Sequence, residues 1–274
     1  MAAPEHELTL TARPDGLRAW IRDLYMYRVA LLVLTRKDLQ TRYKRATFGM
    51  AWAIAVPALQ ATIMALVFSH VVRTGSGNGF PIYVISGVVA FSYFSMTLPT
   101  ASTSIVDGSS LTDKVWFPRA LLPIVPCLSN LIGIAVTVCI LVAIMPAFHV
   151  HYGLKVLLLL PATALLIAFT VGISLLTAAL HVYFRDVRFI VQASLMVWIY
   201  ATPVVYPQHL LGHYASLVDA NPLTGIVTLF HIATVGSMGG SMVAVGISCA
   251  VTVILLVIAS LVHSHHDRLF VDLL

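Results

Sequence analysis

The sequence has few charged residues. Of its 274 residues, 10% are charged and 59% are hydrophobic, and the mean hydropathy is +0.93. A soluble domain typically carries about 25% charged residues. This scarcity argues against a water-soluble domain and predicts an all-α polytopic membrane protein.

Cysteine is also scarce, and several common catalytic motifs are absent. The three cysteines, Cys127, Cys139 and Cys249, all lie in apolar runs and form no CxxC pair, so we expect no disulfide framework. The sequence contains neither a GxxxxGK[ST] phosphate loop nor a GxSxG elbow. We therefore expect no nucleotide site, no cofactor and no catalytic residue in this chain. If ATP and magnesium drive its work, a partner subunit binds them.

Ionisable residues are missing from the middle of the apolar segments. Ion-coupled carriers and proton pumps usually keep such groups there, so both classes are disfavoured. The histidine groups HVH, HLLGH and HSHH have no nearby cysteine or carboxylate cluster to complete a metal site. We interpret them as interfacial histidines. A membrane enzyme is disfavoured as well, because the predicted outer face carries one acid, Asp219.

The apolar residues gather in segments long enough to cross a bilayer. A spanning helix needs about 20 apolar residues, and six segments qualify. They lie near 46–72, 80–106, 119–147, 153–182, 189–206 and 241–263. If both termini are cytoplasmic, 14 of the 16 Lys and Arg residues fall inside, and only Arg73 and Lys155 fall outside. We therefore predict six spans with both termini in the cytoplasm.

Two further segments complete the predicted architecture. Residues 1–45 form a cytoplasmic N-terminal segment with an amphipathic interface helix, whose stripe includes Leu24, Tyr25, Arg28 and Leu32. Residues 46–274 are expected to form one six-span transmembrane domain, with a cytoplasmic loop at 107–119 and a cytoplasmic tail at 264–274. Between 203 and 240 the apolar runs are too short to cross. They predict re-entrant half-helices on the outer face, before the last span, with a short buried helix in an ordinary loop as the alternative.

Four segments of the sequence, read in order, carry a family resemblance. They are RKDLQTRYKRATFGMAWAIAVPALQ (36–60), GSSLTDKVWFPRALLP (108–123), YFRDVRFI (183–190) and NPLTGIVTLF (221–230). In order, spacing and predicted side they resemble the ABC-2 type permeases that export polysaccharides such as O-antigen, capsule and teichoic acid. Among the members of this family, the actinobacterial permeases for lipid-linked cell-wall galactan look most similar. The tail, HSHHDRLFVDLL, departs from the charged ending that is common in the family.

The resemblance implies a bacterial cytoplasmic membrane protein that pairs with a second copy of itself and with two copies of an ABC ATPase. The loop at 107–119 is expected to form a coupling helix that docks on the ATPase, and a plain solvated connector is the alternative. Trp116 and Phe117 would then act as aromatic anchors. The charged residues of the contact would be Asp107, Asp113, Lys114 and Arg119. No nucleic acid partner is expected.

The implied substrate is a glycan on a polyprenyl diphosphate, which needs a wide pore without fixed charges. Aromatic faces suit sugar rings, so the candidate pore residues are Tyr83, Phe91, Tyr93, Phe94, Trp198 and Tyr200. Packing or an interfacial belt is the alternative for each of them. Arg42, Lys44 and Arg45 could meet the diphosphate or lipid headgroups at the inner face. An ABC-2 type exporter of a small molecule or drug is the rival interpretation of the whole chain.

Overall fold

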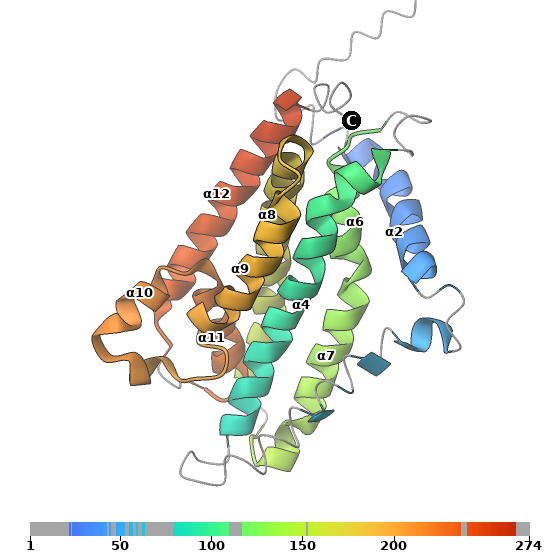
Figure 1. The fold of residues 1–274 in the computed structure, drawn as a ribbon. Helices are drawn as coiled ribbons and strands as arrows, with labels where there is room; N and C mark the ends of the chain where they lie inside the picture. Colours follow the sequence, from blue (N-terminus) through green and yellow to red (C-terminus); the bar gives the residue numbers. More distant parts are fainter. Residues whose placement is uncertain are drawn as a thin grey trace, which may run out of the picture.

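The fold was analysed in a computed structural model. It describes residues 22, 24–42, 44, 48–52, 55–56, 59, 62–63, 79–109, 117–151, 153–236 and 240–266. In these residues the regular elements are all helical (Figure 1). They are α2 (Arg28–Arg42), η1 (Gly49–Ala51), α4 (Phe80–Asp107), α6 (Leu121–Ser129), α7 (Leu131–Ile144), η2 (Met145–Phe148), η3 (Leu154–Leu158), α8 (Leu159–Tyr183), α9 (Val187–Ala201), η4 (Gln208–Tyr214), α10 (Ala215–Asp219), α11 (Pro222–Thr234) and α12 (Met242–His266).

Four helical stretches are long and apolar enough to cross a membrane. They are Phe80–Asp107, Leu121–Phe148, Leu154–Tyr183 and Met242–His265. They correspond to the predicted spans 80–106, 119–147, 153–182 and 241–263, so these four are confirmed by length and composition. The predicted first span, 46–72, lies mostly outside the described residues.

The predicted fifth span is shorter in the structure than in the sequence interpretation. The segment expected at 189–206 is the 15-residue helix α9, which ends at Ala201. At 1.5 Å per residue it is about 22 Å long, less than a full crossing of the hydrocarbon core. The chain then turns through Thr202–Pro207 before η4 begins.

The segment 203–240 holds only short helices among its described residues, as predicted. The longest is α11, with 13 residues, and it is buried on most of its surface. The side chain of Asn221 caps its first turn by accepting a hydrogen bond from the Leu223 N–H, and Pro222 occupies the first helical position. Figure 1 shows α10 and α11 in the lower half of the bundle, beside the start of α12.

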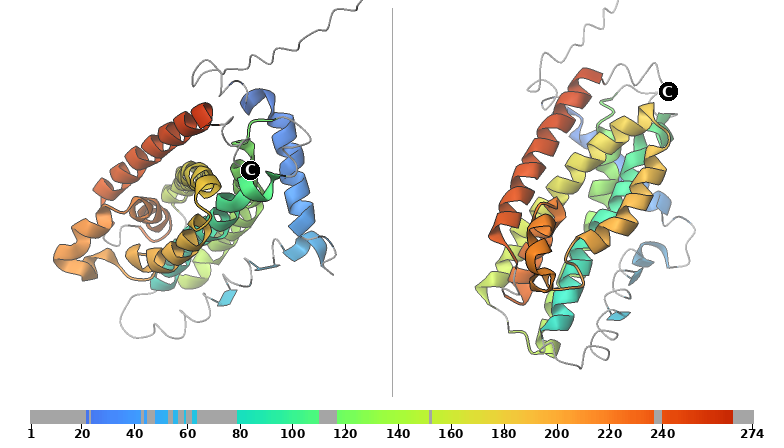
Figure 2. Two further views of the ribbon diagram at one scale, coloured as in Figure 1. Left: turned by 45° about the horizontal axis from the view of Figure 1, so that its top comes forward. Right: turned by 60° about the vertical axis from the view of Figure 1, so that its left-hand side comes forward.

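The helices run alternately between two ends of the bundle (Figures 1 and 2). The upper end holds the ends of α4, α8 and α12 and the beginnings of α6 and α9. The lower end holds the beginnings of α4 and α12 together with η2 and η3. This alternation puts the loop at 107–119, the turn at 184–186 and the end of α12 at one end, as the predicted topology requires.

The core lies where α4, α7, α8, α9 and α11 meet. Its largest fully buried side chains include Phe94, Phe169 and Phe230, with Ile82 and Leu166 between them. Phe94 makes an edge-to-face contact with Trp198 at 5.3 Å between ring centroids and a tilted contact with Phe169 at 5.7 Å. These contacts fix α9 and α8 against α4.

The N-terminal helix α2 and the residues just before it pack on α6. The packed face carries Leu24, Tyr27, Leu31 and Leu34, which contact the cluster around Phe117. Of the predicted stripe, Leu24 lies on this face, whereas Tyr25, 66% exposed, and Leu32, 60% exposed, do not. The position of the helix in the membrane interface stays a prediction.

Candidate functional site

The predicted coupling loop lies at the upper end of the bundle, and the structure describes both of its ends. Asp107 is exposed at the last residue of α4, while Phe117 and Arg119 are buried just before α6. Asp113, Lys114 and Trp116 lie outside the described residues. The helical character of the loop therefore stays a prediction.

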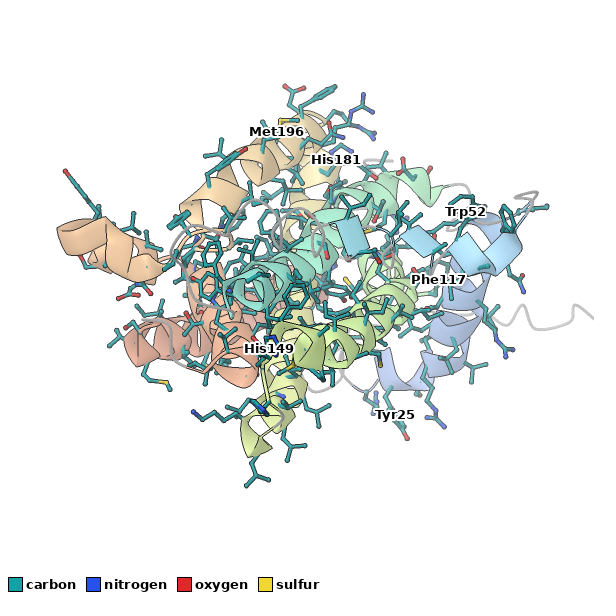
Figure 3. All side chains as sticks on the ribbon, turned by 90° about the horizontal axis from the view of Figure 1, so that it is seen from below. Tyr25, Trp52, Phe117, His149, His181 and Met196 are labelled. Carbon is teal, nitrogen blue, oxygen red and sulfur yellow. The ribbon has the colours of Figure 1, made fainter. Side chains whose placement is uncertain are left out.

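Phe117 supports this end of the bundle from within. Its ring is only 7% exposed and packs in a cluster with Ile105, Leu121 and Val182, next to the packed face of α2. Figure 3 shows it among the helices, whereas Tyr25 and Met196 lie at the outer rim. A side chain buried in its own chain cannot insert into a partner, so Phe117 does not suit the anchor role expected from the sequence. Its contacts instead tie the loop to α2.

A cavity of about 590 Å³ opens beside Asp107, between the end of α4 and the turn from α8 to α9. Its charged and polar lining includes Asp107, His181, Arg185, Arg188 and Gln192. The guanidinium of Arg188 lies 4.5 Å from the centre of the Phe189 ring. The YFRDVRFI segment and the coupling loop, which are far apart in the sequence, thus meet at one polar surface.

The candidate pore residues of α4 are buried within this chain. Tyr83 stacks on His231, with 3.6 Å between ring centroids, and Phe91 and Phe94 pack in the core. The Tyr93 hydroxyl donates a hydrogen bond to the Cys127 carbonyl at 2.9 Å. A residue that lines a pore must expose its side chain, so this burial favours the packing alternative for Tyr83, Phe91 and Phe94. Tyr93 is buried too, but it also lines a small cavity that is described below.

Trp198 and Tyr200, the two candidate pore residues of α9, differ in how far their side chains are exposed. Trp198 packs against Phe94 and donates its indole N–H to Oδ1 of Asn221 at 3.0 Å, which gives it a structural role. Tyr200 is 73% exposed. It shares the outer face of α9 with the exposed side chains of Phe189, Met196 and Val197. Of the six candidates, only Tyr200 therefore presents its ring on an open surface of the chain.

The three basic residues proposed for the inner face lie in different surroundings. Arg42 forms an ion pair with Asp38, with 2.9 Å between Nε and Oδ2, and donates from Nη1 to Oδ1 of Asn130 at 3.0 Å. Lys44 is exposed in the turn after α2, and Arg45 lies outside the described residues. Arg42 thus engages the bundle itself while staying partly exposed, and Lys44 is exposed as well.

Metal binding finds no support in the part of the chain that the structure describes. There, no group of three His, Cys, Asp or Glu side chains is close enough to hold an ion. His149 and His151 line an open cavity at the lower end with Lys155, while a ring nitrogen of His263 lies 3.0 Å from the Leu175 carbonyl oxygen.

Sequence reasoning missed three residues that organise these surfaces: Asp38, Asn130 and Asn221. Asn221 accepts from Trp198 and donates from Nδ2 to the Ala201 carbonyl at 3.0 Å and to the Thr202 hydroxyl at 2.9 Å. Its position before Pro222 is a recognisable helix start. No comparable signal marks Asp38 or Asn130, because their partners lie 91 and 88 residues away in the sequence.

Comparison with known proteins adds independent information. A family profile described as ABC-2 type transporter matches residues 29–235. The chain is 28% identical over 214 residues to the O-antigen export system permease protein RfbA of Myxococcus xanthus, covering 77% of this chain and 82% of the relative. It is also 28% identical over 199 residues to the RfbA protein of Klebsiella pneumoniae, covering 72% and 76%. The polysialic acid transport protein KpsM of Escherichia coli is 23% identical over 209 residues, covering 74% and 80%.

Proposed function

Because the chain belongs to the ABC-2 type transporter family, we propose that it is the permease subunit of an ABC exporter that carries a lipid-linked polysaccharide across the cytoplasmic membrane. The similarity to O-antigen and polysialic acid export proteins over more than 70% of the chain carries this proposal. It favours a glycan over a small molecule or drug. Galactan is the glycan that the sequence motifs suggest.

In this proposal the chain crosses the membrane six times, with the upper end in the cytoplasm. The strong bias of Lys and Arg toward that end supports this orientation. The four long apolar helical stretches alternate in direction, which supports this scheme. The first span is supplied by residues 46–72. The fifth consists of α9 together with the turn that follows it, while η4, α10 and α11 form the re-entrant segment at the outer face.

Energy enters through a separate ATPase, which binds ATP and magnesium. The chain has no phosphate loop of its own, so the partner must act on the cytoplasmic end. The surface formed by Asp107, the cavity around Arg185 and Arg188, and the residues 110–116 is the proposed contact. Because α2 packs on the cluster around Phe117, movement of the loop reaches α2 directly.

Two copies of the chain form the transport pathway. A polymer needs a passage lined by side chains that face open space, and α9 supplies one such face through Met196, Val197 and Tyr200. That face is helical, apolar and unpartnered in the single chain. Pairing two copies across it, with two ATPase subunits at the cytoplasmic end, would enclose a passage between them.

Co-purification tests this proposal. The tagged chain, extracted in mild detergent, should bring down one ABC ATPase in equal amount. ATP hydrolysis by the complex should rise when polyprenyl diphosphate carrying the host cell's glycan is added. If no ATPase co-purifies, or if a drug and not the glycan stimulates hydrolysis, the proposed function is wrong.

A further inference from the structure

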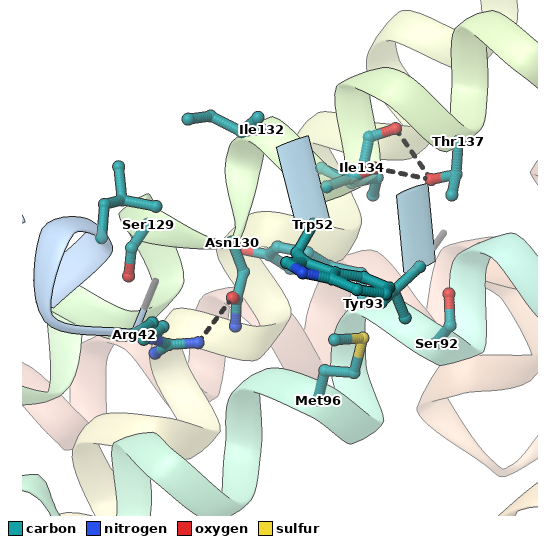
Figure 4. A pocket seen from close by; sticks show the side chains of 13 residues that line it. Arg42, Trp52, Ser92, Tyr93, Met96, Ser129, Asn130, Ile132, Ile134 and Thr137 are labelled. Atoms are coloured by element: carbon teal, nitrogen blue, oxygen red, sulfur yellow. Dashed lines mark hydrogen bonds between the residues drawn. The ribbon is translucent and has the colours of Figure 1, made fainter. Parts of the chain in front are cut away.

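A third cavity lies between the helices, away from the proposed ATPase surface. Its volume is about 150 Å³, and it opens between the end of α2, the segment that begins at η1, the middle of α4 and the break between α6 and α7 (Figure 4). Arg42, Trp52, Tyr93, Asn130 and Gly133 contribute to its wall. None of the roles discussed above explains this cavity.

One side of the cavity is polar, and hydrogen bonds and an ion pair hold its side chains in place. Arg42 joins Asp38 to Asn130, as described above, and Asn130 in turn donates from Nδ2 to the Thr97 hydroxyl at 2.9 Å. Ser129 donates its hydroxyl to Asp38 Oδ2. These contacts lie at the end of the nine-residue helix α6, about 14 Å along an otherwise apolar span. The Arg42 and Asp38 side chains are each 28% exposed, so the chain covers this polar group only in part.

The other side is apolar and aromatic. Trp52, Tyr93 and Met96 all line the cavity, and Figure 4 shows the three side chains on the same side of it. Ile134 and Val56 complete this wall. A small cavity with a flat aromatic face opposite a few oriented hydrogen-bonding groups suits a ring that has an apolar face and a polar edge. A sugar ring has this shape and chemistry.

The charges beside the cavity favour a neutral sugar over a diphosphate as its ligand. The positive charge of Arg42 is offset by Asp38, whose carboxylate would repel an incoming anion. The remaining N–H groups of the guanidinium can still donate to neutral hydroxyls. We propose that this cavity binds one neutral sugar residue of the lipid-linked glycan, with the ring on Trp52 and the hydroxyls against Arg42 and Asn130. The proposal rests on the proposed function and adds a recognition site to it.

Gly133 provides a direct test. A Cβ atom built at Gly133 meets nothing within 4 Å, so a larger side chain can enter the cavity without displacing the backbone. Gly133→Leu should therefore fill the sugar site and leave the fold intact. Gly246→Leu on α12 is the matched control, because a Cβ there also meets nothing within 4 Å and Gly246 lies outside the cavity.

The measurement is binding to the complete complex in lipid nanodiscs. The probes are polyprenyl diphosphates carrying one hexose or one N-acetylhexosamine, compared with the bare polyprenyl diphosphate. Wild type should bind at least one sugar-bearing probe about tenfold more tightly than the bare lipid. Gly133→Leu should lose this preference, while its affinity for the bare lipid and the behaviour of Gly246→Leu stay unchanged.

A second pair of variants tests the aromatic wall. Trp52→Ala should reduce the preference for the sugar-bearing probe. Thr137→Val should preserve it, because the Thr137 hydroxyl already donates to the carbonyls of its own helix at 3.0 Å. The inference is overturned if Gly133→Leu keeps the preference, if it loses affinity for both probes equally, or if wild type shows no preference. A complex that exports glycan normally yet gives one of these results refutes the sugar site alone. A complex that exports no glycan refutes the proposed function.

Discussion

The ring of Tyr83 stacks on the imidazole of His231, with 3.6 Å between the ring centroids. The Tyr83 hydroxyl also hydrogen bonds to the carbonyls of Pro203 at 3.3 Å and Tyr206 at 3.1 Å. A single residue of α4 thus contacts both the turn after α9 and the short helix α11. Because this turn and α11 are both short, we expect their position to depend on such lateral contacts.

We expect the two partners to differ in how much they stabilise the protein. Tyr83→Phe keeps the ring stack and loses only the hydroxyl contacts, which should cost about 1 kcal/mol. His231→Ala leaves a cavity beside Tyr83 and should cost about 2 kcal/mol or more. Thermal unfolding of the purified protein in detergent measures both. A larger drop in Tm for Tyr83→Phe than for His231→Ala would contradict the account.

Gly225 sets how closely α11 approaches α12. A Cβ atom at this position would collide with the Ala244 carbonyl oxygen and with the Ser248 hydroxyl. Small residues permit close backbone contact between helices in membranes. Gly225→Ala should therefore lower the yield of folded protein and its Tm by several degrees.

Gly246→Ala is the control for this effect, because a Cβ at Gly246 meets nothing within 4 Å. It lies two residues after Ala244 on the same helix and should leave Tm unchanged or slightly raised, since alanine favours helix. Fluorescence-detected size-exclusion profiles of the two variants, compared at rising temperature, provide the measurement. Equal behaviour of both variants would show that the close approach is not needed.

The proposed orientation predicts which residues can be labelled from outside the cell. In a variant without the native cysteines, a single cysteine at His151 or Gly212 should react with a membrane-impermeant maleimide in intact cells. A cysteine at Asp186 should react only after the membrane is opened. The reason is that nearly all Lys and Arg residues fall on the side of Asp186. Labelling of Asp186→Cys in intact cells would place this residue outside the cell and contradict the predicted topology.

The coupling loop should separate ATPase contact from folding. Trp116→Ala should weaken co-purification of the ATPase or uncouple ATP hydrolysis from export, because loss of a central aromatic anchor typically costs about 2 kcal/mol or more. Phe117→Ala should instead lower Tm, because Phe117 is buried in this chain. Replacing Arg73 by alanine on the opposite face should do neither. If Trp116→Ala couples ATP hydrolysis to export normally, the loop is not the essential ATPase contact, and α2 becomes the candidate for it.

Hydropathy predicted the long helices because the bilayer imposes a length on apolar segments. The bounds of α4, of α12 and of the combined stretch Leu154–Tyr183 were predicted to within about three residues, and the segment that holds the short α11 was recognised as too short to cross. The break at Asn130 was not predicted, although Pro123 and Pro126 in α6 suggested a kink. Breaks depend on what side chains from other helices offer, and Arg42 comes from a different part of the chain.

The candidate site was predicted less completely for the same physical reason. Composition indicates that Tyr83, Phe94 and Trp198 suit either sugar contacts or packing, and only burial decides between them. The sequence shows that Arg42 is basic but not that Asp38 offsets its charge. Long-range pairing of side chains is a property of the fold, and periodicity does not report it.

The most direct test of the central claim is the side of the membrane on which the lipid-linked glycan resides when this chain is depleted. We predict that the completed glycan accumulates on its polyprenyl carrier in intact cells and is inaccessible to an added lectin or glycosidase until the membrane is opened. Restoring the chain should make that glycan accessible from outside. If the lipid-linked glycan does not accumulate on depletion, or if it remains accessible at the outer face, the chain does not export it.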